Sequence, residues 1–157
     1  MDTNEISLIF AKALKNSHTK FLGVFPSDHI PCISDIAKQA PCAYILNTDP
    51  CTEPGTHWVA FYHPSPSILE FFDSFGRSPS FYGFSVPSTM HLLYNTRTFQ
   101  SQNSLLCGQY CIMFIHNRSL CKSLQGILRR LDSLTPIKSD QLVLSYVSFL
   151  SDRMKKQ

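Results

Sequence analysis

Long apolar runs are absent from this sequence. No stretch of about 18 consecutive apolar residues occurs, so no membrane-spanning helix is predicted. The opening residues MDTNEISLIFAKALKNSHTK carry acidic residues early and lack a small-residue cleavage site after an apolar core, so no secretory signal is visible. We therefore expect a protein that is neither secreted nor embedded in a membrane.

Closely spaced cysteine pairs are absent as well. A zinc site would have to recruit Cys42, Cys51, His57, Cys107 or Cys111, which form no C-x2-C pair and no repeated His/Cys spacing. We therefore predict no metal site. The chain has six cysteines, but a chain of this size without a visible signal peptide is expected to keep its thiols reduced, in a cytosolic or nuclear setting.

No internal repeat, low-complexity segment or linker interrupts the 157 residues, of which 43% are hydrophobic and 12% aromatic. This composition is typical of a globular protein with a substantial core. We predict one domain over residues 1–157 and a monomeric protein.

Charge is distributed unevenly along the chain. Residues 1–117 carry six Lys/Arg and eight Asp/Glu, whereas residues 118–157 carry eight and three. A basic C-terminal part of this kind can bind a phosphate backbone or an acidic partner, so non-specific DNA binding is one hypothesis. Solvated helix faces are the alternative interpretation.

The first half of the sequence predicts a helix followed by strands. Apolar residues at helical spacing indicate an amphipathic helix over roughly 4–15. Three short segments rich in β-branched and aromatic residues, separated by turn residues, are typical of neighbouring strands of an antiparallel sheet: 42–48, 57–63 and 68–75. A further strand is expected over 93–100.

The second half is predicted to be helical. Ser104 is a suitable N-cap for a buried, central helix over about 105–116, which places Cys107 in the first turn. Apolar residues from Leu120 to Leu131 indicate another helix, and Ser139 can cap a last one. The predicted fold class is therefore α+β, with helices around a mixed or antiparallel sheet.

Cys107 raises two competing interpretations. A buried cysteine is usually an inert, small apolar residue, whereas a thiol in the first turn of a helix can be a nucleophile. A cysteine protease also needs a base, a group that orients the base, and donors to the oxyanion. The candidates are His57 as base, Asp73 accepting the Nδ1 proton of His57, and the Gln100 amide beside the Cys107 N–H. Each of the three partners, taken alone, is more often a structural or solvated residue.

The order and content of these motifs resemble a known family. The chain is similar to the adenovirus protease family, with relatives in viruses and Polinton-type mobile elements, from about Phe21 to Asn117. The resemblance rests on the segments FLGVF, CAYILNT, EPGTHWVAFYH, LEFFDSFG and QSQNSLLCGQYCIMFIH.

The resemblance implies the adenain-type cysteine protease fold and a site made of His57, Asp73, Gln100 and Cys107. It also implies that Trp58 walls a narrow channel suited to glycine. A cysteine endopeptidase acting on viral structural precursors during particle maturation is then expected, in the virion and in the host nucleus or cytoplasm.

The sequence departs from the family pattern in two respects. Asp73 stands where adenovirus enzymes commonly have Glu, which is compatible with activity. No cysteine lies between Asp73 and Gln100, where those enzymes carry the thiol that joins their activating peptide. The chemistry requires no cofactor, and a peptide and DNA are the candidate activators, although covalent peptide attachment is disfavoured.

Alternative functions remain open at this point. A protease that removes ubiquitin-like modifiers shares the His-Trp, Asp, Gln and Cys-Gly elements. A non-enzymatic DNA- or capsid-binding accessory protein with the same fold is the third hypothesis. Other cysteine-protease plans fit less well, because papain places its cysteine before the histidine and caspases need Gln-Ala-Cys where this chain has Leu105, Leu106 and Cys107.

Overall fold

A computed structural model describes residues 2–155 of the chain. The first helix, α1 (Thr3–Ala13), confirms the helix predicted over 4–15. Its start is fixed by a capping box, in which the Asp2 side chain accepts from the Glu5 N–H and the Glu5 side chain accepts from the Asp2 N–H.

The sheet has five strands whose spatial order follows the chain. They are β1 (Lys20–Phe25), β2 (Cys42–Asn47), β3 (Trp58–Ser65), β4 (Ile68–Phe72) and β5 (His91–Tyr94). The three central strands pair antiparallel, as predicted. The two outer pairs are parallel, so the sheet is mixed.

One predicted strand needs correction, and one observed strand was not predicted. The strand expected over 93–100 ends at Tyr94, because the segment after it instead follows the turn after β4, where the Phe99 and Gln100 N–H groups donate to the Ser74 carbonyl. Strand β1 was not predicted, since Gly23, which lies at φ +125°, interrupts its pairing with β2 between Phe21 and Val24.

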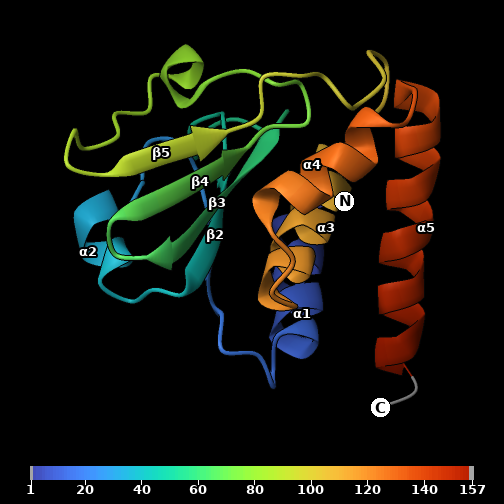
Figure 1. Cartoon of the computed structure of the whole chain (residues 1–157), viewed down its shortest axis with the longest axis horizontal. Helices are drawn as coiled ribbons and strands as arrows, with labels where there is room; N and C mark the ends of the chain where they lie inside the picture. The colour runs from blue at the N-terminus through green and yellow to red at the C-terminus, as the bar shows by residue number, and fades with distance from the viewer. Residues whose placement is uncertain (1, 156–157) are drawn as a thin grey trace.

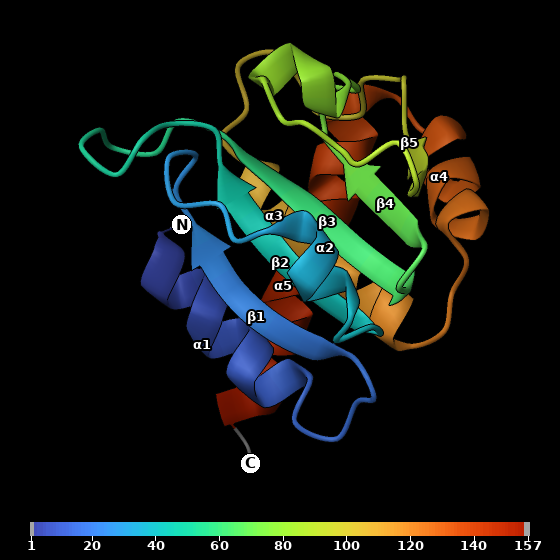
Figure 2. The ribbon, with the colours of Figure 1, turned by 90° about the vertical axis from the view of Figure 1, so that its left-hand side faces the viewer.

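Helices cover the two faces of the sheet unequally. Helices α1, α3 (Cys107–Ser119), α4 (Leu124–Asp132) and α5 (Pro136–Lys155) gather on one face (Figure 1). The opposite face is covered by the short helix α2 (Ile33–Ala37) and by the segment of the 3-10 helix η1 (Pro79–Tyr82) (Figure 2). Alternate residues of each central strand therefore enter two separate apolar cores.

Helix α3 is the central, buried helix that the sequence predicts, but its start differs. It begins at Cys107 rather than 105, its N-cap is Leu106, and the Ser104 hydroxyl has no hydrogen-bond partner among the described residues. The Ser104 carbonyl instead accepts a bond from the Gln100 side chain, which keeps the residues before Cys107 out of the helix. The predicted helix 120–131 is α4, with Leu120 left outside as the exposed C-cap of α3.

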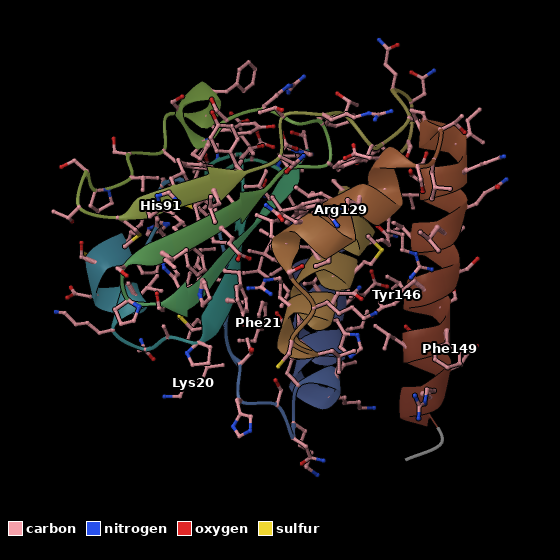
Figure 3. The ribbon with its side chains drawn as sticks, in the orientation of Figure 1. Lys20, Phe21, His91, Arg129, Tyr146 and Phe149 are labelled. Atoms are coloured by element: carbon pink, nitrogen blue, oxygen red, sulfur yellow. The ribbon has the colours of Figure 1, made fainter. Side chains whose placement is uncertain are left out.

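The last helix starts earlier than predicted. Ser139 is buried inside α5, and its N–H donates to the Thr135 carbonyl, because Pro136 already begins the helix with a favourable φ. Tyr146 of α5 points toward α3, where its hydroxyl lies 2.6 Å from His116 Nδ1 (Figure 3).

The structure also bears on the cysteines and on membrane-spanning helices. All six cysteines are free thiols. Within residues 2–155, no helix combines the length and apolar character needed to cross a membrane.

Candidate active site

His57 and Asp73 meet because their strands run antiparallel. His57 directly precedes β3 and Asp73 directly follows β4, so both lie at the same edge of the sheet. The His57 Nε2 atom is 2.7 Å from Asp73 Oδ1. Both side chains are almost fully buried, with 8% of His57 and none of Asp73 exposed. The structure thus brings together the predicted base and its orienting carboxylate.

The ring nitrogen in this contact differs from the one predicted. Asp73 was expected to accept the Nδ1 proton, whereas it faces Nε2. A hydrogen bond at Nε2 fixes the ring so that Nδ1, the atom nearer the main chain, is left for the thiol.

Four donors hold the Asp73 carboxylate. Besides His57, the Phe75 N–H donates to Oδ1, and the Arg77 N–H and the Tyr82 hydroxyl donate to Oδ2, at 2.9–3.0 Å. The burial of this anion is therefore compensated at both oxygens. Its pKa is lowered, because these bonds and the His57 charge outweigh desolvation, which acts in the opposite direction.

Asn95 fixes the main chain of the same residue. Its Oδ1 accepts from the Asp73 N–H at 3.1 Å, and its Nδ2 donates to the Asp73 carbonyl at 2.6 Å. Asn95 is itself buried, so neither the backbone nor the side chain of Asp73 has freedom to turn.

His57 is poised to carry a positive charge. Burial alone would lower its pKa, but hydrogen bonds to Asp73 and Cys107 and the charges of those groups raise the pKa to about 9. The ring centroids of Phe75 and Tyr82 lie 5.1 and 5.9 Å from the centroid of the imidazole ring, and the two rings shield the imidazole from water.

Cys107 is the first residue of α3, where main-chain N–H groups lack intrahelical partners and the helix dipole favours an anion. It shares a cavity of about 450 Å³ with His57, Gln100, Trp58, Phe75 and Leu105. Cys107 is 4% exposed, and its thiol is among the groups that raise the pKa of His57. The cavity thus contains a thiol beside a base at a helix N-terminus.

Gln100 is held with its NH2 group toward the residues before Cys107. Its Oε1 accepts from the Ser74 hydroxyl at 2.7 Å, and its Nε2 donates to the Ser104 carbonyl at 2.6 Å. One of the two Nε2 hydrogens remains for an oxyanion in the cavity.

Trp58 is half-buried, packs against the core beneath α3 and lines the same cavity. Its Nε1 donor is buried and has no hydrogen-bond partner within residues 2–155. Trp58 therefore gives the site an apolar wall, and its indole N–H is a donor without a partner among the described residues.

Sequence reasoning missed the supporting residues. Ser74, Tyr82 and Asn95 orient Gln100 and Asp73, but none of them stands in a recognisable spacing. Of the three, only Ser74 could have been suggested by its position, because it directly follows Asp73 and so lies at the same sheet edge.

Comparison with known proteins identifies a family for the chain. The family described as adenovirus endoprotease matches residues 21–156. The chain belongs to the adenovirus endoprotease family. The match continues through the helices after Asn117, so it extends beyond the segment on which the sequence resemblance rested.

Curated relatives are viral proteins called protease. The protease of bovine adenovirus B serotype 3 is 32% identical over 61% of this chain and 54% of its own length. The protease of bovine adenovirus C serotype 10 is 33% identical over 61% and 56%, and that of snake adenovirus serotype 1 is 28% identical over 69% and 61%. The chain thus spans little more than half the length of the curated relatives that it matches.

Proposed function

We propose that this protein is a viral cysteine endopeptidase with Cys107 as nucleophile, His57 as base and Asp73 as orienting group. The observation that carries the proposal is the shared cavity, in which the first residue of a buried helix lies beside an imidazole bonded to a buried carboxylate. Membership of the adenovirus endoprotease family supports it.

The chemistry begins with a proton transfer. His57 takes the proton of the Cys107 thiol, and the raised pKa of His57 favours the resulting imidazolium and thiolate pair. The thiolate attacks the substrate carbonyl carbon, and the imidazolium then gives its proton to the leaving amine. Water activated by His57 hydrolyses the thioester and regenerates the thiol.

The tetrahedral intermediate needs donors for its oxygen. The Gln100 Nε2 and the Cys107 N–H fulfil this role in the proposal, because both border the cavity where the carbonyl must lie. Ser74 keeps the acceptor end of the Gln100 amide turned away from the oxyanion.

The substrate residue before the scissile bond is proposed to be glycine. Trp58 and Leu105 border the cavity beside the thiol, and a side chain on that residue would meet these walls. Viral structural precursors, cleaved during particle maturation in the virion or in the host nucleus or cytoplasm, are the proposed substrates.

A side-by-side assay tests this proposal. Short peptides of the form aliphatic-x-Gly-x and aliphatic-x-Gly-Gly should be cleaved after glycine, and Gly→Val before the bond should block the reaction. Cys107→Ala protein is the blank, since it lacks only the nucleophile.

The modifier-processing alternative predicts the opposite pattern. Fast processing of an intact ubiquitin-like domain with inert peptides would replace the proposed substrate class. Cleavage after bulky residues would refute the narrow channel, and turnover by Cys107→Ala would refute the mechanism.

A further inference from the structure

Three groups that can bind a metal meet outside the active site. Asp28 and His29 lie in the segment between β1 and α2, and Cys51 lies in the loop between β2 and β3. One ligand atom from each side chain lies within 4.8 Å of the other two, and all three residues are exposed. Figure 2 shows the β2–β3 loop extending beyond the sheet beside the end of β1.

The protein already holds these groups in place. The Cys51 N–H donates to Asp28 Oδ1 at 2.8 Å, and the Cys51 sulfur lies 3.1 Å from Asp28 Oδ2. His29 Nδ1 is 3.4 Å from Asp28 Oδ1. Main-chain pairing of Ser27 with Asp49 at 3.0 Å joins the same two segments. Main-chain bonds between the two segments therefore place Cys51 beside Asp28, and the exposed His29 ring adds its contact with Asp28.

The spacing suits a tetrahedral ion. Ligand atoms about 2.0–2.3 Å from a tetrahedral metal lie about 3.3–3.8 Å from one another, so the observed separations need only small rotamer changes. A thiolate, an imidazole nitrogen and a carboxylate oxygen form a ligand set for Zn²⁺, whereas Mg²⁺ and Ca²⁺ prefer oxygen atoms alone.

We propose that Asp28, His29 and Cys51 bind Zn²⁺ or a similar divalent transition metal, with water as the fourth ligand. On binding, the Cys51 thiol releases its proton to solvent and the sulfur bonds to the metal as a thiolate. No electron is transferred.

The bound metal would restrain the loop that leads to His57. Asp49 Oδ2 accepts from both the N–H and the hydroxyl of Thr56 at 2.6 Å, and Thr56 lines the candidate active-site cavity. A metal that joins Cys51 to Asp28 and His29 therefore restrains a loop with one end at the metal and the other at the base. This proposal does not depend on the proposed protease activity.

Metal binding is measured on the full chain carrying Cys107→Ser, which removes the thiol beside His57 as a competing site. Titration with Co²⁺ should give one equivalent bound, with a thiolate-to-cobalt absorption band, and Zn²⁺ should displace it. Adding Cys51→Ser or His29→Ala should abolish the absorption band or weaken the affinity for Co²⁺ by at least about 10–100-fold. Even the loss of a residue that only hydrogen-bonds to a metal ligand weakens metal affinity by this range. Zn²⁺ should also slow amide hydrogen exchange in residues 48–56.

Cys32→Ser is the matched control, because Cys32 is another exposed thiol beside a carboxylate, that of Asp35, but outside the three-residue cluster. It should leave binding unchanged. Unaltered cobalt affinity in Cys51→Ser or in His29→Ala would overturn the proposal, as would a failure of the Cys107→Ser protein to bind Co²⁺ and Zn²⁺ at all.

Discussion

Gln100 illustrates how one side chain is prepared for an incoming charge. Its carbonyl oxygen is occupied by Ser74 and its NH2 group faces the cavity side of the loop before Cys107. An amide fixed in this way loses no orientational freedom when the oxyanion forms, which is why such donors contribute strongly to catalysis.

Replacing Gln100 by Ala should lower kcat by about 10²–10³, the usual effect of removing one oxyanion donor. Asn103→Ala is the matched control, because Asn103 is an exposed amide in the same loop. Steady-state kinetics on both variants, with circular dichroism to check the fold, measure the difference. A silent Gln100→Ala together with an impaired Asn103→Ala would mean that the wrong amide is assigned.

The His57 charge should make stability depend on pH. Its pKa is raised from 6.5 to about 9 on folding, so its contribution is fully present below pH 6.5 and is lost as pH rises through 9. The unfolding free energy of wild type minus that of His57→Gln should therefore be largest near pH 6 and shrink by pH 10. Urea unfolding over this range measures it, and a difference that grows with pH would contradict the assigned charge state.

At the scale of elements, the turn after β4 positions the carboxylate and its donors. Gly76 lies at φ +71°, and a Cβ there would come within 2.6–2.8 Å of the Arg97 main chain. The turn and the segment after β5 therefore approach each other backbone to backbone, which aims the Phe75 and Arg77 N–H groups at Asp73.

Gly76→Ala should destabilise the protein and lower activity by displacing these donors. Gly83→Ala is the matched control, because Gly83 has a similar φ of +74° but open space around it. The control should cost only the backbone strain, about 1–2 kcal/mol, and keep its activity. Denaturant unfolding and kinetics on the two variants separate strain from steric clash, and equal behaviour would argue against the close approach.

Local sequence patterns predicted the helices and strands that bury one face or are buried completely. Helix α1 and the buried α3 followed from apolar spacing, and the three central strands from their β-branched and aromatic content, because these segments face the cores. Strand β1 and helix α2 could not be predicted, since β1 contains Gly23 and α2 has only five residues. The parallel pairing of β1 with β2 and of β5 with β4 depends on long connections that carry no local signal.

The candidate site was predictable only in part for the same reason. His57, Asp73, Gln100 and Cys107 follow from chemistry, order and family resemblance, and the structure places them together. Tyr82 and Asn95 reach Asp73 through contacts between segments separated by 9 and 22 residues, which no short motif encodes. The N-cap predicted at Ser104 was wrong, because the Ser104 carbonyl already accepts a hydrogen bond from the Gln100 side chain.

At the scale of the whole molecule, the basic C-terminal part is less available than its charge suggests. Arg118 forms an ion pair with the buried Glu70 at 2.6 and 2.9 Å and so is not free for a ligand. Arg129 and Arg130 on α4 are exposed, and Figure 3 labels Arg129 there. Lys156 and the side chain of Lys155, which the sequence also suggested for DNA binding, lie outside the described residues.

We propose that the exposed arginines of α4 contribute to non-specific DNA binding. Replacing Arg129 and Arg130 by Gln should weaken binding and flatten the salt dependence by about 0.9 in log–log slope for each phosphate that is no longer neutralised. Lys20→Gln with Lys38→Gln removes the same charge from β1 and from the end of α2 and should have little effect. Fluorescence anisotropy at several salt concentrations measures this, and no binding by wild type at low salt would assign the arginines to solvated faces.

If Cys107 is the nucleophile, it should react ahead of the other five thiols in a direct competition. By exposure alone Cys32, Cys51 and Cys121 should react first, since Cys107 is buried. The measurement is mass-spectrometric mapping of the first adduct formed with a short glycine-ended peptide electrophile at limiting concentration. One adduct should form, on Cys107, and it should be lost in His57→Ala, whereas modification of the three exposed cysteines ahead of Cys107 would show that Cys107 is not the nucleophile.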